Sequence, residues 1–247
     1  MRPVHVARQA IKRARAILRW LEKAGLSRAR ARRHELARYM RQLSRRRNAV
    51  VTVQLSRRLA RKVRGSTRAA AFALAATRVP RQSRGWWKSW RQSVARAEER
   101  LGRLPRGGPD VRALSSCLFD SYHRACRWAR KVRRHGRISS AHEWRKTVVL
   151  WREQLLLAPP LGPTALTGLR DHLHQLTHRL GQAVDCQLLL ETLAGRRWPK
   201  IPDRAPRKLA ALARHRQKHA LKRARRLWKK IEADWHRAGR HTRSTAT

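Results

Sequence analysis

Apolar residues recur at steps of three and four along most of this chain, the spacing that places side chains on one face of an α-helix. The first such stretch spans residues 5–21, and its apolar face carries Val4, Ala7, Ile11, Ala14, Leu18 and Leu21. Further stretches with this pattern cover about residues 27–63, 69–76, 86–104, 110–135, 139–155, 166–193 and 208–237. Only residues 50–53 could form a strand instead. The sequence therefore predicts an all-α protein.

Proline, glycine and serine mark the boundaries between the predicted helices. Gly25 suits the end of the first helix and Ser27 can cap the second. Residues 105–109, Pro-Arg-Gly-Gly-Pro, are the clearest linker, and the prolines of 159–163 predict a turn. We expect a single domain over 1–238, with one lobe at about 1–135 and a second at about 136–238. A disordered basic tail is expected at 239–247.

The charge of the chain points to a polyanionic partner. Sixty-two Lys and Arg residues stand against 14 Asp and Glu, which gives a formal net charge of +48. Such self-repulsion destabilises a compact fold unless anions neutralise it. The hydrophobic fraction of 41% and the 10 tryptophans argue against a disordered chain. Nucleic acid, an anionic membrane surface and an inorganic polyanion all remain possible partners on charge alone.

Basic residues form rows beside the apolar faces rather than opposite them. One residue corresponds to about 100° of helix rotation, so the first row borders the packed side of its helix. Most charge runs are merely solvated helix faces. Here, acids that could pair with the cations at i+4 are nearly absent, so the rows favour an anion-binding surface. The first row consists of His5, Arg8, Lys12, Arg15 and Arg19, and another of Arg124, Arg127, Lys131 and Arg134.

A His-x-x-Arg pattern begins two of the predicted helices. His5 precedes Arg8 by one helical turn, and His142 precedes Arg145 in the same way, with Lys146 and Arg152 beyond it. An imidazole and a bidentate guanidinium at this spacing can donate hydrogen bonds to the same phosphate group. A single histidine would be read as a cap or a packed side chain, whereas two copies suggest a duplicated helical bundle.

Several other functional classes find little support in the sequence. Three cysteines without a CxxC pair favour neither a disulfide framework nor a zinc site. The triplet His172, His174 and His178 lacks the glutamate of a zinc hydrolase, so packing or phosphate contact is its expected role. No P-loop, HExxH, GxSxG or ExExK pattern occurs, and we expect a non-catalytic protein without a metal or cofactor. There is no membrane span or secretory signal, and the Arg-rich N-terminus recurs internally, so a cytoplasmic location is expected.

The ordered set of motifs resembles the CHAD family, the conserved-histidine α-helical domain. Residues 5–15 are similar to the family's H-x-x-R-x-x-x-R-R-x-R helix, and 142–146 to its H-E-L-R-K segment. Residues 180–185 resemble the L-G-x-x-x-D turn, and Tyr122-His-Arg124 resembles the basic helix before the second repeat. The second repeat departs from the family at Val149 and Leu150, where cations are usual.

This resemblance implies two pseudo-symmetric antiparallel helical bundles, duplicated four-helix-type lobes, around a basic central groove. It also implies binding of inorganic polyphosphate and association with polyphosphate granules. The expected binding residues are His5, Arg8, Lys12, Arg13, Arg15, Arg19, Arg124, Arg127, His142, Arg145, Lys146 and Arg152.

Two other functions remain open from the sequence. A nucleic-acid-binding protein is the main alternative, with Trp86 and Trp87 as an exposed stacking platform for bases. A phosphohydrolase would need a carboxylate cluster in the basic groove. The sequence does not determine the oligomeric state or the preferred chain length of a polyphosphate ligand.

Overall fold

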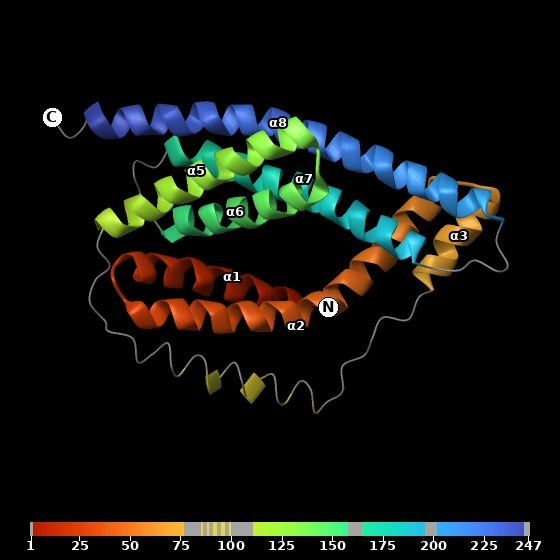
Figure 1. Cartoon of the computed structure of the whole chain (residues 1–247), viewed down its shortest axis with the longest axis horizontal. Coiled ribbons are helices and arrows are strands. Elements are labelled where there is room, and N and C mark those ends of the chain that lie inside the picture. Colours follow the sequence, from red (N-terminus) through yellow and green to blue (C-terminus); the bar gives the residue numbers. More distant parts are fainter. Residues whose placement is uncertain are drawn as a thin grey trace. The chain divides into compact units, whose positions relative to one another are not determined.

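The computed structural model describes residues 2–76, 111–157, 165–195 and 202–244, together with 85, 88, 91, 92, 95, 96 and 99. Within these residues the chain is all-helical, as predicted, and residues 50–53 belong to a helix rather than a strand. The helices are α1 (Arg2–Lys23), α2 (Ser27–Ala60), α3 (Gly65–Ala75), α5 (Val111–His135), α6 (Ile138–Leu157), α7 (Ala165–Ala194) and α8 (Arg204–Ser244) (Figure 1).

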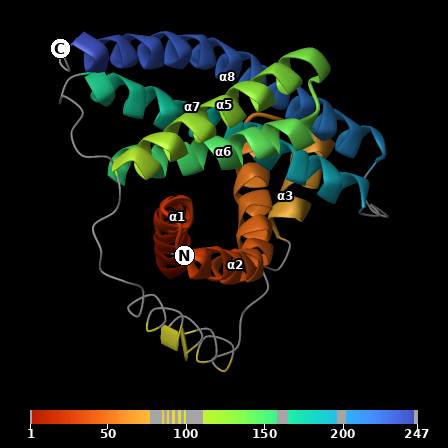
Figure 2. The ribbon, with the colours of Figure 1, turned by 60° about the vertical axis from the view of Figure 1, so that its left-hand side comes forward.

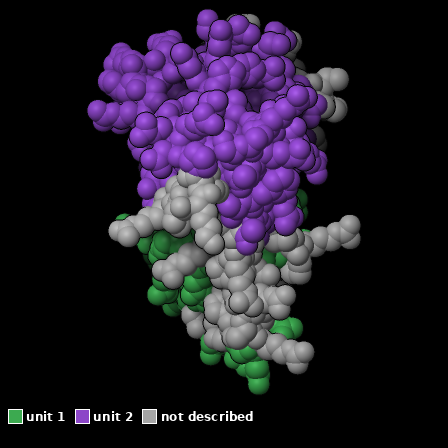
Figure 3. Space-filling model, turned by 90° about the vertical axis from the view of Figure 1, so that its right-hand side faces the viewer, with its two compact units in different colours: residues 1–49, 78–117 green, residues 50–77, 118–247 purple. Residues whose placement is uncertain are grey.

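The chain divides into two compact units, coloured separately in Figure 3. Unit 1 comprises residues 1–49 and 78–117, and unit 2 comprises residues 50–77 and 118–247. The division falls within α2 and within α5, so neither unit is one continuous segment. The two predicted lobes divide the chain once, at about residue 135, and they stay a prediction.

Unit 1 contains an antiparallel pair formed by α1 and the first part of α2. Val4, Ile11 and Leu18 of α1 are buried, as the sequence pattern predicts, and they pack in one cluster with Ala29, Leu36 and Leu43 of α2. The turn between the helices requires Gly25, because its φ of +91° is strained for other residues. The Leu26 amide donates to the Leu21 carbonyl at 3.0 Å, which closes the end of α1.

Unit 2 contains the end of α2, α3, the greater part of α5, and α6 to α8. In both ribbon views α8 lies along α7, and α3 lies beside the first turns of α8 (Figures 1 and 2). One buried cluster joins Leu59 of α2, Leu74 of α3, Leu189 of α7 and Leu209 of α8. This packing fixes which faces of α7 and α8 remain open to solvent.

A second part of the unit 2 core is aromatic. Trp144 and Trp151 of α6 are completely buried, so they are core residues as their helical spacing predicts. The Trp151 ring meets the rings of Tyr122 and Trp235 at centroid distances of 5.5 and 5.1 Å. Edge-to-face and tilted contacts of this kind add stability beyond their buried area. The cluster therefore joins α5, α6 and α8.

Residues 180–185 lie inside α7, as the predicted helix over 166–193 requires, although they resemble a turn motif of the family. Leu180, Ala183 and Cys186 are all buried. Helix α8 continues to Ser244, whereas the sequence predicts a disordered tail from residue 239. The linker at 105–109 and the turn at 159–163 lie outside the described residues, as does most of the predicted helix 86–104.

Candidate anion-binding site

The first basic row runs along the side of α1 that borders α2. Arg8, Lys12, Arg15 and Arg19 are half-buried, whereas His5 and Arg13 are exposed. The Arg8 guanidinium donates to Ser44 Oγ at 3.0 Å and to the Met40 carbonyl at 3.4 Å, both on α2. The row therefore lies beside the packed helix pair, as the pattern predicts.

Arg15 is the most unusual cation of unit 1. Burial lowers the pKa of its guanidinium, and the nearby charges of Arg33 and Arg41 on α2 lower this pKa further. Among the described residues, no acceptor lies within hydrogen-bonding reach of its buried Nε. The Arg15 guanidinium thus has two like charges near it and one unused donor, so an anion close to it would be stabilising.

Glu22 pairs with cations near the C-terminal end of this row. Glu22 accepts a hydrogen bond from Arg33 Nε at 2.9 Å and lies 3.6 Å from Arg19 Nη1. Burial by itself would raise the pKa of Glu22, but Arg33, Arg19 and Arg30 lower it below its ordinary value. Arg19 and Arg33 are therefore partly neutralised.

In the second copy of the motif, Arg145 of α6 lies against the backbone of α7 at Gly181. A Cβ atom added to Gly181 would lie 3.4 Å from Arg145 Nε and 3.6 Å from Nη2. Gly181 thus leaves room for the guanidinium plane to rest on the helix. His142, one turn before Arg145, is half-buried. The two motifs that resemble family patterns, at 142–146 and at 180–185, therefore meet in space.

The remaining cations of α6 already have protein partners. Arg152 is ion-paired with Glu153, and its Nη1 lies 3.4 Å from Thr177 Oγ1 and 3.3 Å from His174 Nδ1. Exposed Lys146 pairs with Glu143 at 2.7 Å. The half-buried Val149 and Leu150 extend no cationic row there.

On α5, Arg124 and Arg127 are exposed side chains of unit 2. The histidines of α7 have other roles than metal binding in this arrangement. His172 Nδ1 lies 2.7 Å from Asp234 of α8, and His178 Nε2 lies 3.0 Å from the Gln182 amide. In the described part of the chain, no group of three or more His, Cys, Asp or Glu side chains is placed to hold a metal ion.

We compared the sequence of the chain with models of known protein families. Residues 2–194 match the family model described as the CHAD domain. The chain belongs to the CHAD domain family. The match spans α1 through α7 and ends where α7 ends, so α8 lies beyond it. No curated protein and no solved structure matches the chain.

CHAD domains are associated with polyphosphate-related proteins. In this CHAD domain the first His-x-x-Arg motif belongs to unit 1 and the second to unit 2. The groove expected between the two copies stays a prediction. None of the described helices is long and apolar enough to cross a membrane.

Sequence reasoning did not single out three residues of this CHAD domain. Arg33 and Arg41 surround Arg15, but α2 contains so many arginines that spacing alone could not distinguish these two. Gly181 was part of a recognised motif, although its contact with Arg145 needed the packing of α6 on α7.

Proposed function

We propose that this CHAD-domain protein binds inorganic polyphosphate through the basic faces of α1 and α6, without hydrolysing it. The observation that carries the proposal is the group of Arg15, Arg33 and Arg41. A lowered guanidinium pKa and a buried, unsatisfied Nε are unfavourable in the free protein. A phosphate bound beside these residues would offset the repulsion between their charges.

The chemistry of polyphosphate suits this surface. It is a flexible chain of phosphates without bases, so nothing in the ligand demands an aromatic platform. Guanidinium groups bind phosphate oxygens in a bidentate manner, and displaced counterions add to the affinity. Binding should therefore weaken steeply as the salt concentration rises.

A granule location follows from the same charge. A net charge of +48 lets one protein molecule neutralise a long segment of polyphosphate, so the protein would concentrate where the polymer accumulates. A fluorescent fusion should coincide with polyphosphate granules in cells. It should disperse when polyphosphate synthesis is blocked, and a pattern independent of polyphosphate would contradict granule association.

The decisive experiment is a competition titration at physiological salt. Fluorescent long-chain polyphosphate is displaced by unlabelled polyphosphate, double-stranded DNA or single-stranded RNA at matched charge concentration. We expect polyphosphate to compete at least tenfold better, which corresponds to about 1.4 kcal/mol. A parallel assay of released orthophosphate should show no hydrolysis.

Nucleic acid is the main alternative outcome of this titration. Equal competition by RNA or DNA would contradict polyphosphate selectivity and favour a general nucleic-acid-binding role. The proposed stacking residues Trp86 and Trp87 lie outside the described residues. Fluorescence quenching by single-stranded DNA would test them directly.

A further inference from the structure

Helix α8 carries a row of exposed cationic and titratable side chains on the side away from its packed face. Its members, which we call the α8 strip, recur at helical spacing, and at about 1.5 Å per residue the strip is roughly 20 Å long. Leu209, Ala213 and Ala220 occupy the buried side of the same turns. The α8 strip consists of Lys208, His215, His219 and Lys222.

One end of the strip opens into a hollow beside the start of α3. This pocket has a volume of about 550 Å³ and is lined by Arg64 and Thr67 together with Lys208, Leu212 and His215 of α8. Cationic groups thus approach the hollow from two separate helical elements. A phosphate group seated there would meet Arg64, Lys208 and His215 together.

At the other end, cations of α7 and α8 surround His219. Its imidazole is fully exposed, yet its pKa is lowered. The largest cause is the charge of Arg223, followed by slight desolvation and the charges of His215, Lys222 and Arg179. The rings of His215 and His219 are stacked with centroids 6.4 Å apart. The neighbouring cations therefore disfavour protonation of His219, even though its side chain is exposed to water.

No acid of α8 compensates the strip. The acids of this helix are Glu232 and Asp234, and Asp234 is engaged with His172 of α7. Among the described residues, Arg179 has Gln182 rather than a carboxylate as its hydrogen-bond partner. Ordinary salt-bridge formation thus does not explain this surface.

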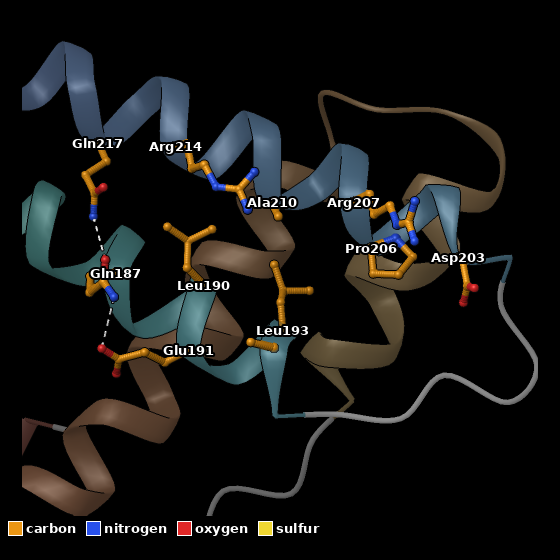
Figure 4. Close-up of a pocket in the computed structure, with 11 residues that line it drawn as sticks. Gln187, Leu190, Glu191, Leu193, Asp203, Pro206, Arg207, Ala210, Arg214 and Gln217 are labelled. Carbon is orange, nitrogen blue, oxygen red and sulfur yellow. Dashed lines mark hydrogen bonds between the residues drawn. The ribbon is translucent and has the colours of Figure 1, made fainter.

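A second pocket in unit 2 differs from this surface. It lies between the end of α7 and the start of α8, and Glu191 and Asp203 line it together with Arg207 and Arg214 (Figure 4). Gln187 bridges Gln217 and Glu191 by hydrogen bonds of 3.2 and 3.1 Å. Its mixed charges do not favour a polyanion, which leaves the α8 strip as the stronger candidate.

We propose that the α8 strip, with Arg64, Arg179 and Arg223 beside it, is a second binding surface for a linear phosphate polymer. This inference rests on the proposed function for the identity of the polymer, inorganic polyphosphate. The strip lies on a helix beyond the family match, and it shares no residue with the basic faces of α1 and α6. No Trp, Tyr or Phe belongs to the strip or lines its pocket, so base stacking would not contribute.

Proton uptake should accompany binding at this surface. Bound phosphates offset the charges of Arg223, Lys222, Arg179 and His215 that lower the pKa of His219, so this pKa rises in the complex. A group that gains protons on binding makes affinity increase as the pH falls. Binding to the strip is therefore tighter at pH 5.5 than at pH 8.

The test compares two matched double variants of the full chain, Lys222→Gln/Arg223→Gln in the strip and Arg57→Gln/Arg58→Gln at the exposed end of α2. Affinity for polyphosphate of defined length is measured against salt concentration. The strip variant should reduce the slope of log affinity against log salt by about one for each phosphate that the protein no longer neutralises. The control variant should leave the slope unchanged, and equal losses of affinity in both variants would overturn the proposal.

A second readout follows the His219 imidazole by NMR, with its signal assigned from the His219→Gln variant. Its pKa should rise when polyphosphate is added. An unchanged pKa would overturn the assignment, and an equal rise with single-stranded RNA at matched charge would overturn selectivity for polyphosphate.

The two proposals fail in different ways. If substitutions of Arg15 and Arg145 abolish binding while the strip variant behaves like wild type, the proposal for the α8 strip is wrong. The proposed site on α1 and α6 is then supported. If the Arg15 and Arg145 variant binds normally and the strip variant does not, the strip stands and the α1 and α6 site is wrong.

Discussion

The Arg145 guanidinium lies on the backbone of α7 at Gly181, where an added Cβ would lie 3.4 Å from Nε. That distance is ordinary van der Waals contact, so the space holds one methyl group and little more. The contact links the His-x-x-Arg motif of α6 to the Leu-Gly motif of α7. It also limits the size of the side chain that this position of α7 can carry.

We predict opposite outcomes for two substitutions of Gly181. Gly181→Ala should be tolerated and should change polyphosphate affinity little, because the methyl group meets Arg145 without overlap. Helix propensity should raise the free energy of unfolding by up to about 1 kcal/mol. Gly181→Leu should displace the guanidinium and weaken binding. Titration and urea unfolding of both variants test this, and equal affinities would show that the position of Arg145 is irrelevant to binding.

Arg15→Met should weaken polyphosphate binding and make the free protein more stable. The variant removes a half-buried cation whose charge is repelled by Arg33 and Arg41, and it keeps a side chain of similar length. In polyphosphate-free buffer the free energy of unfolding should rise by about 1 kcal/mol or more, while polyphosphate affinity falls. Arg57→Met, at an exposed position of α2 outside the proposed site, is the control. A decrease in both stability and affinity would mean that Arg15 has a structural role instead.

Removing one arginine from each motif should show whether the site is localised. Arg8→Ala combined with Arg145→Ala should weaken polyphosphate binding at least about tenfold at physiological salt, because both guanidinium groups are held in place by packing. Arg57→Ala combined with Arg58→Ala removes the same charge from an exposed surface. Similar decreases in affinity in the two double variants would indicate binding by net charge alone.

The Arg8 substitution also removes hydrogen bonds to α2, at a cost of about 1 kcal/mol. Circular dichroism melts of each variant should therefore accompany the titrations. Binding is compared at a temperature where all variants are folded.

Titration of Cys186 should make the free energy of unfolding decrease as the pH rises above 9. Burial raises the pKa of its thiol from 9.0 to about 11. Between these values the unfolded thiol has released its proton while the folded thiol retains it, so the unfolded state is favoured as the pH rises. The contribution is complete below pH 9 and declines by up to about 1.4 kcal/mol per pH unit between 9 and 11.

Urea unfolding under reducing conditions at several pH values measures this effect. Cys186→Ala should show a shallower decline than the wild type, whereas Cys126, whose pKa burial also raises, stays in both proteins. Identical slopes would show that Cys186 does not titrate in this range.

Much of the helical structure was predictable because helix formation depends on residues three and four positions apart. The buried faces of α1 and α7 follow directly from their apolar spacing, and Gly25 ends α1 as expected. The spacing over 166–193 also predicted that α7 continues through Gly181, although the family resemblance suggested a turn there. The sequence did not show that Gly181 contacts Arg145 of α6.

The proposed binding residues stay a prediction, to which sequence and structure contribute differently. Their placement beside the apolar faces is a property of one helix, so the sequence alone suggests Arg8 and Arg145. It could not distinguish Arg15, which has burial and like charge around it, from Arg152, which Glu153, Thr177 and His174 compensate. These differences arise from side chains contributed by neighbouring helices.

By itself, the sequence determined the all-α class, the strong positive charge and the two His-x-x-Arg helices, because each depends on composition or on neighbours within two turns. Only the tertiary structure decided that Arg33 and Arg41 lie near Arg15, that Arg145 contacts α7 at Gly181, and that Arg64 and Arg179 lie near the α8 strip. Electrostatic interactions depend on distances across packed helices, and packing sets those distances.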